Sequence, residues 1–431
     1  MQLLPRIPSL PTKLSFGLGR RSGEELVGLD IQPGFVAAVR ARVNGSIVAE
    51  RAAAVALPAD AVRDGEVIDE EVLGAALSEL FAGSGLGKRV RVGVANQRTV
   101  LRTLEVPPVT DPKELAAAVR FQAQDQVPMP LNNAVMDFHP LGIADTPAGP
   151  RQRVVLVAAQ RDMIERLLAA VRRAGLTPGG VDLSAFAMIR SLYHRDPASS
   201  AEEEQLPRVL YLNVDGLTNL AIAEGTVCRF TRVVGGGLEG MAAGLAERRS
   251  IALSEARALL AAADMNAPVD QPSPEATTEL PADEIEPEAP AAGQPMSAEE
   301  LDASERGMSY EELASVASAS GESASVEPSV PQPAADGEVL KVLQSGIRDI
   351  SGEVRNSLDF HRSQEGGGEV SHVVMSGAAQ DIPGFAEALQ QALGVEVRCE
   401  AVGVLDASVA ESVSPHRLAV ATGLAAVEAP R

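Results

Sequence analysis

Two acidic hairpin turns are the parts of this 431-residue chain best placed to do chemistry. In the first, an apolar run enters a turn through Asp30 and leaves it after Gln32 and Gly34, a pattern that predicts a β-hairpin. A carboxylate at such a tip can hold a metal ion through water, beside a phosphate bound by the turn N–H groups. It can also stabilise its own turn by accepting backbone hydrogen bonds. The residues alone leave both readings of Asp30 open.

A related hairpin is expected far downstream, where Asp215 and Gly216 form the turn. A glycine triplet then opens a helix, and such a helix start can bind an anion or simply turn tightly. A repeated hairpin of this kind suggests a duplicated architecture with a cleft between its halves. The residues that could contact a nucleotide in this cleft are Asp30, Gln32, Gly34, Asp215, Gly216, Thr218, Gly235, Gly236, Gly237, Ser376 and Gly377.

Composition excludes several classes of function. The net charge is −22, and the stretch from Asp264 to Asp336 holds 17 acidic residues against the single base Arg306, so −16 of that charge lies there. Nucleic-acid binding requires a basic face, which we therefore do not expect. The two cysteines and five histidines show no metal-ligand spacing. No apolar run is long enough to span a membrane, and we expect no secretory signal.

A distinct group of elements interrupts the first half of the chain. Between Arg102 and Gly175 the pattern reads strand, helix, strand, strand, helix, which is typical of a small inserted α+β subdomain. Asp111 and Pro112 predict the start of its first helix, because an acidic cap followed by proline favours a helix N-terminus. We expect a Gly/Pro loop over residues 142–152. Residues 264–336 are rich in Ala, Pro, Glu and Ser, which predicts disorder.

The order of these motifs resembles the actin-like ATPase superfamily and, within it, the PilM family of cytoplasmic type IV pilus assembly proteins, relatives of the division protein FtsA. The motifs that carry the resemblance are Gly28-Leu29-Asp30-Ile31, Asp64-Gly65-Glu66-Val67-Ile68, Asp125-Gln126-Val127-Pro128-Met129-Pro130-Leu131, Ala174-Gly175-Leu176-Thr177-Pro178, Ser376-Gly377-Ala378-Ala379 and Ala421-Thr422-Gly423-Leu424-Ala425. The resemblance implies an α/β fold of two duplicated, ribonuclease H-like lobes with a small α+β subdomain inserted in the first lobe.

The resemblance also implies how the chain divides. The predicted parts are a mobile tail (1–23), subdomain 1A (24–101 and 177–205), inserted subdomain 1C (102–176), subdomain 2A (206–245 and 366–431), subdomain 2B (246–263 and 337–365) and the acidic disordered insertion (264–336).

The family's phosphate-binding pattern is degraded in this sequence. ATP and Mg²⁺ are the cofactors that the resemblance implies, with Asp30 holding the metal through water. The first hairpin, however, has Gln32 at the family's glycine position and Ala37 at its lysine position. Pro33 removes an N–H that could face phosphate, and Asp215 adds negative charge beside it. We therefore expect a degenerate nucleotide cleft and no catalytic residues, with an active ATPase as the alternative.

The resemblance implies a protein partner in place of a substrate. In this family a groove formed by residues 102–176 with subdomain 1A takes the N-terminal peptide of a PilN-like inner-membrane protein. The chain would then act in the cytoplasm at the inner face of the membrane and connect indirectly to the pilus motor ATPase, with self-association left open and no direct insertion into the membrane. A type II secretion subunit of the same fold is a further alternative.

The start of the chain itself looks like the partner peptide. Family peptides contain Asn-Leu-Leu-Pro followed by a basic or aromatic residue, and this chain begins Gln2-Leu3-Leu4-Pro5-Arg6. One hypothesis is that this tail occupies its own or a neighbour's groove, where tethering supplies a high effective concentration. The other is a mobile tail with a chance match.

Overall fold

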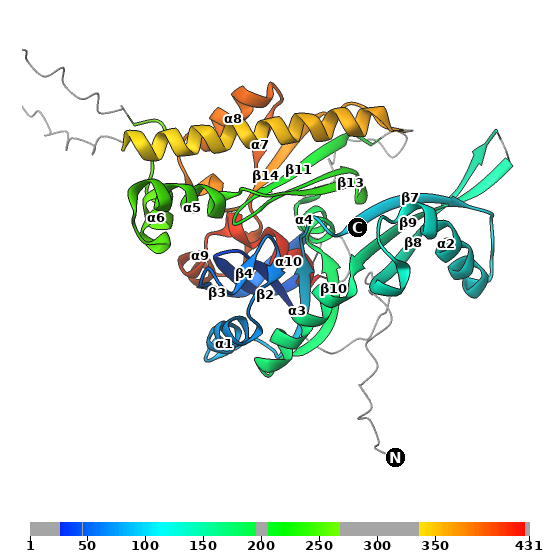
Figure 1. Ribbon diagram of the computed structural model, residues 1–431, viewed down its shortest axis with the longest axis horizontal. Helices are drawn as coiled ribbons and strands as arrows, with labels where there is room; N and C mark the ends of the chain where they lie inside the picture. Colours follow the sequence, from blue (N-terminus) through cyan, green and yellow to red (C-terminus); the bar gives the residue numbers. More distant parts are fainter. Residues whose placement is uncertain are drawn as a thin grey trace, which may run out of the picture. The chain divides into compact units, whose positions relative to one another are not determined.

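The computed structural model describes residues 26–44, 46–147, 149–194, 206–267, 336–364 and 366–426. The predicted N-terminal tail, its Leu3-Leu4-Pro5 match and nearly all of the acidic insertion lie outside these described residues. Two larger sheets and one smaller sheet organise the rest (Figure 1).

The first sheet has six strands in the order β10-β6-β1-β2-β3-β16. Their bounds are β1 (Val27–Gln32), β2 (Phe35–Asn44), β3 (Ser46–Ala56), β6 (Arg89–Val94), β10 (Thr177–Leu183) and β16 (Gly403–Val404). The predicted Asp30 hairpin is present, since β1 and β2 pair antiparallel with Gln32 opposite Phe35. A short hairpin of β4 (Val62–Arg63) and β5 (Glu66–Val67) leads into α1 (Glu70–Phe81), which Asp69 caps as its residue type predicts.

The second sheet has five strands in the order β13-β12-β11-β14-β15. Their bounds are β11 (Arg208–Val214), β12 (Thr218–Glu224), β13 (Val227–Val234), β14 (His372–Ser376) and β15 (Val397–Cys399). Helices α5 (Leu238–Arg249), α6 (Leu253–Ala261), α7 (Gly337–Ser363) and α8 (Phe385–Leu393) share one apolar core with this sheet. Figure 1 shows α7, the longest of them, running across the sheet.

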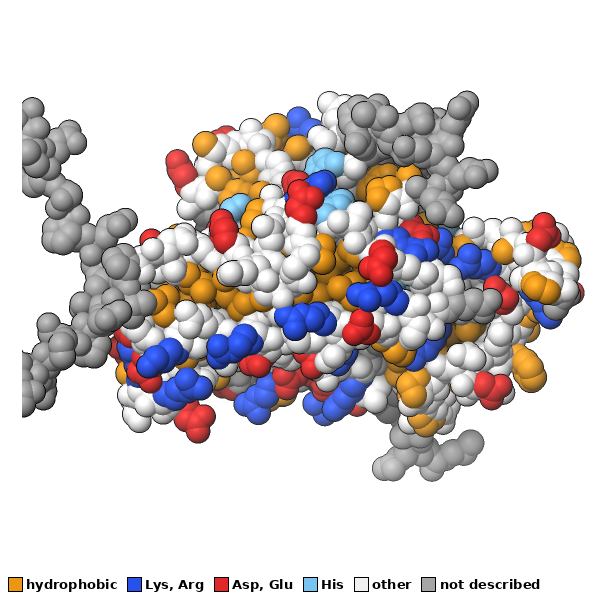
Figure 2. Space-filling model, turned by 90° about the horizontal axis from the view of Figure 1, so that it is seen from above, with side chains coloured by type: hydrophobic (Ala, Val, Ile, Leu, Met, Phe, Trp, Pro, Cys, Tyr) orange, Lys and Arg blue, Asp and Glu red, His pale blue; other side chains and the backbone are white. Residues whose placement is uncertain are grey.

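The outer face of α7 carries a row of basic side chains. Lys341, Arg348, Arg355 and Arg362 are exposed and recur every seven residues, which is close to two helical turns. Figure 2 shows this row along the helix, with acidic side chains between and beside the basic ones.

The predicted inserted elements form the third sheet, in the order β7-β9-β8. It contains β7 (Val100–Val106), β8 (Ala134–Thr146) and β9 (Gly149–Gln160), with α2 (Pro112–Gln126) packed on it and η1 (Leu131–Asn133) before β8. The expected loop over 142–152 is wrong, because β8 and β9 continue as a paired hairpin to Thr146 and Gly149. Helix α3 (Arg161–Arg173) follows the strands but packs against α1 and β10 of the first sheet.

The end of the chain returns to the first sheet. β16 pairs with β3, and α9 (Ala407–Ser412), η3 (Pro415–Leu418) and α10 (Ala419–Ala425) follow it, whereas η2 (Ala378–Asp381) lies after β14. The sequence-based prediction assigns all of 366–431 to subdomain 2A, whereas the structure pairs β16 of this range with β3 of the first sheet. The other subdomain boundaries stay a prediction.

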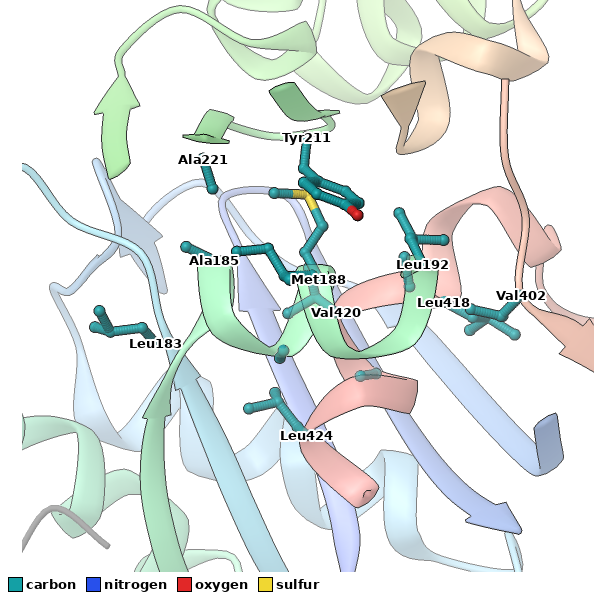
Figure 3. Packing of buried hydrophobic residues seen from close by; sticks show 14 of the residues in the cluster. Leu183, Ala185, Met188, Leu192, Tyr211, Ala221, Val402, Leu418, Val420 and Leu424 are labelled. Carbon is teal, nitrogen blue, oxygen red and sulfur yellow. The ribbon is translucent and has the colours of Figure 1, made fainter. Parts of the chain in front are cut away.

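Two buried helices fill the space between the two large sheets. Seven of the nine residues of α4 (Ser184–Leu192) are buried, as expected of a helix that is surrounded by core. Figure 3 shows Met188 of α4 directed at Tyr211 of the second sheet, with α10 on its other side. Every residue of α10 is buried. The backbone of α10 lies close to the backbone of β1, because a Cβ on Gly28 of β1 would collide with the Ala421 carbonyl oxygen of α10.

Candidate functional site

The two predicted hairpin tips face one another in the structure. A Cβ on Gly216 would collide with the Pro33 carbonyl oxygen, so the backbones are in direct contact there. The Gln32 Oε1 atom accepts a hydrogen bond from the Leu217 N–H at 3.4 Å. Asp30, Gln32 and Asp215 are all at least 95% buried. The tips therefore contact each other through protein atoms at the position where the sequence predicted phosphates.

Arg417 of η3 neutralises the acid of the second hairpin. Its guanidinium group donates to both carboxylate oxygens of Asp215, through Nε at 2.9 Å and Nη2 at 2.6 Å. The same group lies 3.4 Å from the ring centroid of Phe35, so it also makes a cation–π contact with β2. Burial alone would lower the pKa of Arg417, but Asp215 holds this pKa above its ordinary value. Bidentate pairing fixes the geometry of both groups.

Asp30 lacks such an arginine and depends on Gln32. The Gln32 Nε2 atom lies 3.3 Å from each carboxylate oxygen of Asp30. Burial and the nearby charge of Asp215 raise the pKa of Asp30 to about 7, against smaller opposite effects of Gln32 and Arg417. Two carboxyl groups close together in a dry site favour one shared proton. Near neutral pH, Asp30 is therefore poised between its neutral and charged forms.

The remaining predicted residues lie around this cluster, some in direct contact with it and others not. The Ser376 hydroxyl donates to the Asn213 side chain at 3.0 Å, and the N–H of Ala378, just after Gly377, donates to Asp215 at 3.2 Å. Thr218 is fully buried, and its hydroxyl has no hydrogen-bond partner in the described part of the chain.

Gly237 of the glycine triplet and Gly34 are in close contact with other parts of the protein. Gly237 packs so tightly on the second hairpin that a Cβ there would collide with the Asp215 carbonyl oxygen. That carbonyl also accepts the Leu238 N–H at 2.8 Å, which fills the start of α5. Gly236 has a positive φ and open space around it, while Gly34 lies against Glu239 and Arg257 of α5 and α6.

Sequence reasoning missed Arg417, the one cation bonded to this cluster within the described residues. It lies 202 positions after Asp215, and no local motif marks it. Its only signal is indirect, in that it directly precedes the Ala/Leu-rich run that becomes α10. In the same described part of the chain, no group of three or more His, Cys, Asp or Glu side chains is arranged to hold a metal ion.

The sequence matches the family of type IV pilus assembly protein PilM over residues 28–232. The predicted resemblance is therefore confirmed for this segment. It includes the first hairpin, the inserted sheet, and strands β11, β12 and most of β13 of the second sheet.

A solved structure shares the fold of nearly the whole chain, and two others are more distantly similar. A chain of a PilM–PilN type IV pilus biogenesis complex is similar with a TM-score of 0.65 at 21% identity, covering 93% of this chain and 98% of that one. The ethanolamine utilization protein EutJ from Carboxydothermus hydrogenoformans has a TM-score of 0.45 at 14% identity, covering 94% and 90%. MreB 5 of Spiroplasma citri bound to AMPPNP has a TM-score of 0.43 at 10% identity, covering 94% and 95%. Among the described residues, no helix has both the length and the apolar character of a membrane span.

Removing Arg417 should destabilise the folded chain strongly. Arg417→Met leaves the buried Asp215 carboxylate without its counter-ion, which should lower the free energy of unfolding by about 3–5 kcal/mol. The double variant Arg417→Met/Asp215→Asn should recover part of that loss. Urea unfolding measures both, with Arg398→Met as the control, since solvent screens the exposed Arg398–Glu396 pair and its loss should change stability little. Equal losses at positions 417 and 398 would contradict the role of Arg417.

The raised pKa of Asp30 makes stability depend on pH in a defined direction. The folded state keeps the Asp30 proton up to pH of about 7, whereas an unfolded aspartate releases it near pH 4, so stability falls as the pH rises between those values. Asp30→Asn removes this dependence. The stability gain of the variant over the wild type should therefore be about 3 kcal/mol larger at pH 8 than at pH 5. A gain that is the same at both pH values would show that Asp30 is ionised throughout.

Proposed function

We propose that this chain is a cytoplasmic scaffold of a type IV pilus assembly machine that binds the N-terminal peptide of a PilN-like inner-membrane protein. The family match over residues 28–232 carries the proposal, and the fold similarity to a PilM–PilN complex supports it. The scaffold would work at the inner face of the membrane and relay the state of the motor ATPase to the membrane partner.

The proposed peptide groove lies between the inserted subdomain and the first sheet. Where these parts meet, Val157 of β9, Ile164 of α3 and Val181 of β10 are buried side by side.

The degenerate cleft is the second part of the proposal. The contact between Pro33 and Gly216 supports it, because it brings the hairpin tips together where a phosphate chain would lie, and Arg417 already pairs with both carboxylate oxygens of Asp215. Phosphoryl transfer depends on positioned phosphates and metal. The residues present therefore do not fit MgATP in this arrangement, and the scaffold role does not require nucleotide turnover.

A peptide titration tests the scaffold role. A synthetic peptide carrying Asn-Leu-Leu-Pro should bind the full-length chain saturably in calorimetry, because its leucines would bury apolar surface in the proposed groove. A matched peptide with Asn-Ser-Ser-Pro should bind at least about tenfold more weakly, given roughly 1.5–3 kcal/mol for each buried leucine. Deleting residues 1–12 should raise the peptide affinity if the tail competes for the same groove. Equal affinity for the two peptides would refute the groove.

A nucleotide titration tests the cleft. Calorimetry with MgATP up to millimolar concentration should give no saturable heat, and phosphate release should not exceed that of a buffer control. The physical reason is the closed contact between the hairpin tips. Micromolar binding or sustained phosphate release would instead favour the alternative, an active actin-like ATPase.

A further inference from the structure

A cavity of about 360 Å³ lies between the second sheet and the C-terminal end of α4. Its lining includes the apolar side chains of Val209 in β11, Val374 in β14 and Leu192 in α4, which belong to the core that joins this sheet to the helix. Small-molecule sites usually have volumes of about 300–1,000 Å³. The cavity lies where β11 and β14 begin, at the opposite end of β11 from Asp215, so the charged cluster does not account for it.

Two tyrosine side chains line this cavity with unpaired hydroxyl groups. Tyr211 of β11 is only 2% exposed, and Figure 3 shows its hydroxyl directed toward the Leu192 end of α4. Tyr193 directly follows α4, and its hydroxyl would lie 3.8 Å from a Cβ on Gly225. In the described part of the chain, neither hydroxyl has a hydrogen-bond partner. Because buried polar groups are normally hydrogen-bonded, the partner of these hydroxyls must lie in the cavity.

A carboxylate without a counter-ion gives the cavity a negative charge. Glu400, just after β15, is partly buried, and its side chain has no ion pair or hydrogen bond within the described residues. It lies near Tyr211, because burial and then Tyr193 and Glu400 raise the pKa of that phenol. Arg398 also lines the cavity, but it donates two hydrogen bonds of 3.0 Å to Glu396. Counting Arg398 together with Glu396 and Glu400, one net negative charge remains.

Two histidines complete the polar part of the lining. His372 begins β14, and its Nδ1 atom lies 2.9 Å from the Ser371 hydroxyl oxygen. Burial, and then Arg398, lower the pKa of His372, so its ring adds no positive charge near neutral pH. His194 is exposed and follows Tyr193. The net charge beside the two hydroxyls therefore stays negative when both histidines are neutral.

These groups match a primary ammonium cation on an apolar body. An ammonium group has three N–H donors and no acceptor. The cavity offers three unpaired acceptor groups, which are the Glu400 carboxylate and the two tyrosine hydroxyls. The charge of Glu400 favours a cation over an anion, and tyrosine rings also attract cations. The buried leucine and valine side chains suit the apolar part of such a molecule.

We propose that this cavity is a binding site for a small primary amine with an apolar body. The ammonium group would donate hydrogen bonds to Glu400 and to both tyrosine hydroxyls. The apolar body would lie against Leu192 and Val374. The cavity shares no lining residue with the hairpin cluster or with the proposed peptide groove, so this proposal does not depend on the scaffold role.

Intrinsic tyrosine fluorescence tests the ligand class. The chain has three tyrosines and no tryptophan, and two of the three tyrosines line the cavity. Cyclohexylmethylamine, cyclohexylmethanol and cyclohexanecarboxylate are titrated into the full-length chain at a pH of about 8, where an ordinary histidine is uncharged. The amine should bind saturably with a dissociation constant of about 1 mM or lower. The alcohol should bind at least about tenfold more weakly, and the carboxylate should give no saturable change. Equal affinity for amine and alcohol, or no saturable change with the amine, overturns the proposal.

A pair of matched variants locates the charge. Glu400→Gln and Glu387→Gln each remove one carboxylate near Cys399, but Glu387 is exposed on α8 and does not line the cavity. Glu400→Gln should weaken the amine about tenfold and leave the alcohol unchanged, whereas Glu387→Gln should weaken the amine less than about twofold. Equal weakening by both variants would show diffuse electrostatic attraction and overturn a site in the cavity.

Removing one hydroxyl separates a ligand contact from a structural role. Tyr211→Phe keeps the ring and loses only the hydroxyl, and Tyr193 remains as the fluorophore. The variant should bind the amine about tenfold more weakly, because one hydrogen bond to a charged group is lost. Its urea midpoint should be unchanged or higher, since the hydroxyl has no partner within the described protein. Unchanged amine affinity, or a lower urea midpoint that accounts for the loss, would contradict the site.

Discussion

The placement of one short helix determines much of this structure. Helix α10 contacts β1 where Gly28 has no side chain and contacts α4 where a Cβ on Gly423 would collide with the Ala187 carbonyl oxygen. Such approach is available only to glycine and small residues, and it lets α10 lie fully buried between strand and helix. The first sheet, α4 and the end of the chain are thereby held as one packed body.

That packing also positions the charged cluster. η3 leads directly into α10, so a fixed α10 places Arg417 over Phe35 and against Asp215. Arg417 thereby joins Phe35, which follows the first hairpin tip, to Asp215 of the second tip through non-covalent contacts, close to where Pro33 and Gly216 touch.

Local patterns in the sequence correctly predict the parts of the fold that depend on residues close together in the chain. Asp69 and Asp111 cap helices as their residue types predict, and the β1–β2 hairpin follows from its alternating pattern. The region 142–152 was misread as a loop because Gly and Pro also occur in a twisted strand pair. Arg417, β16 and the cavity between α4 and the second sheet depend on contacts between distant segments, which one sequence does not reveal.

The return of the chain to its first sheet has a consequence for biosynthesis. Strand β1 is made long before its partner α10, which begins at Ala419. At about 5–20 residues per second, the delay is on the order of 20–80 s. During that interval the apolar surface of β1 and α4 has no cover from α10. Completion of the first core therefore waits until α10 has left the ribosome.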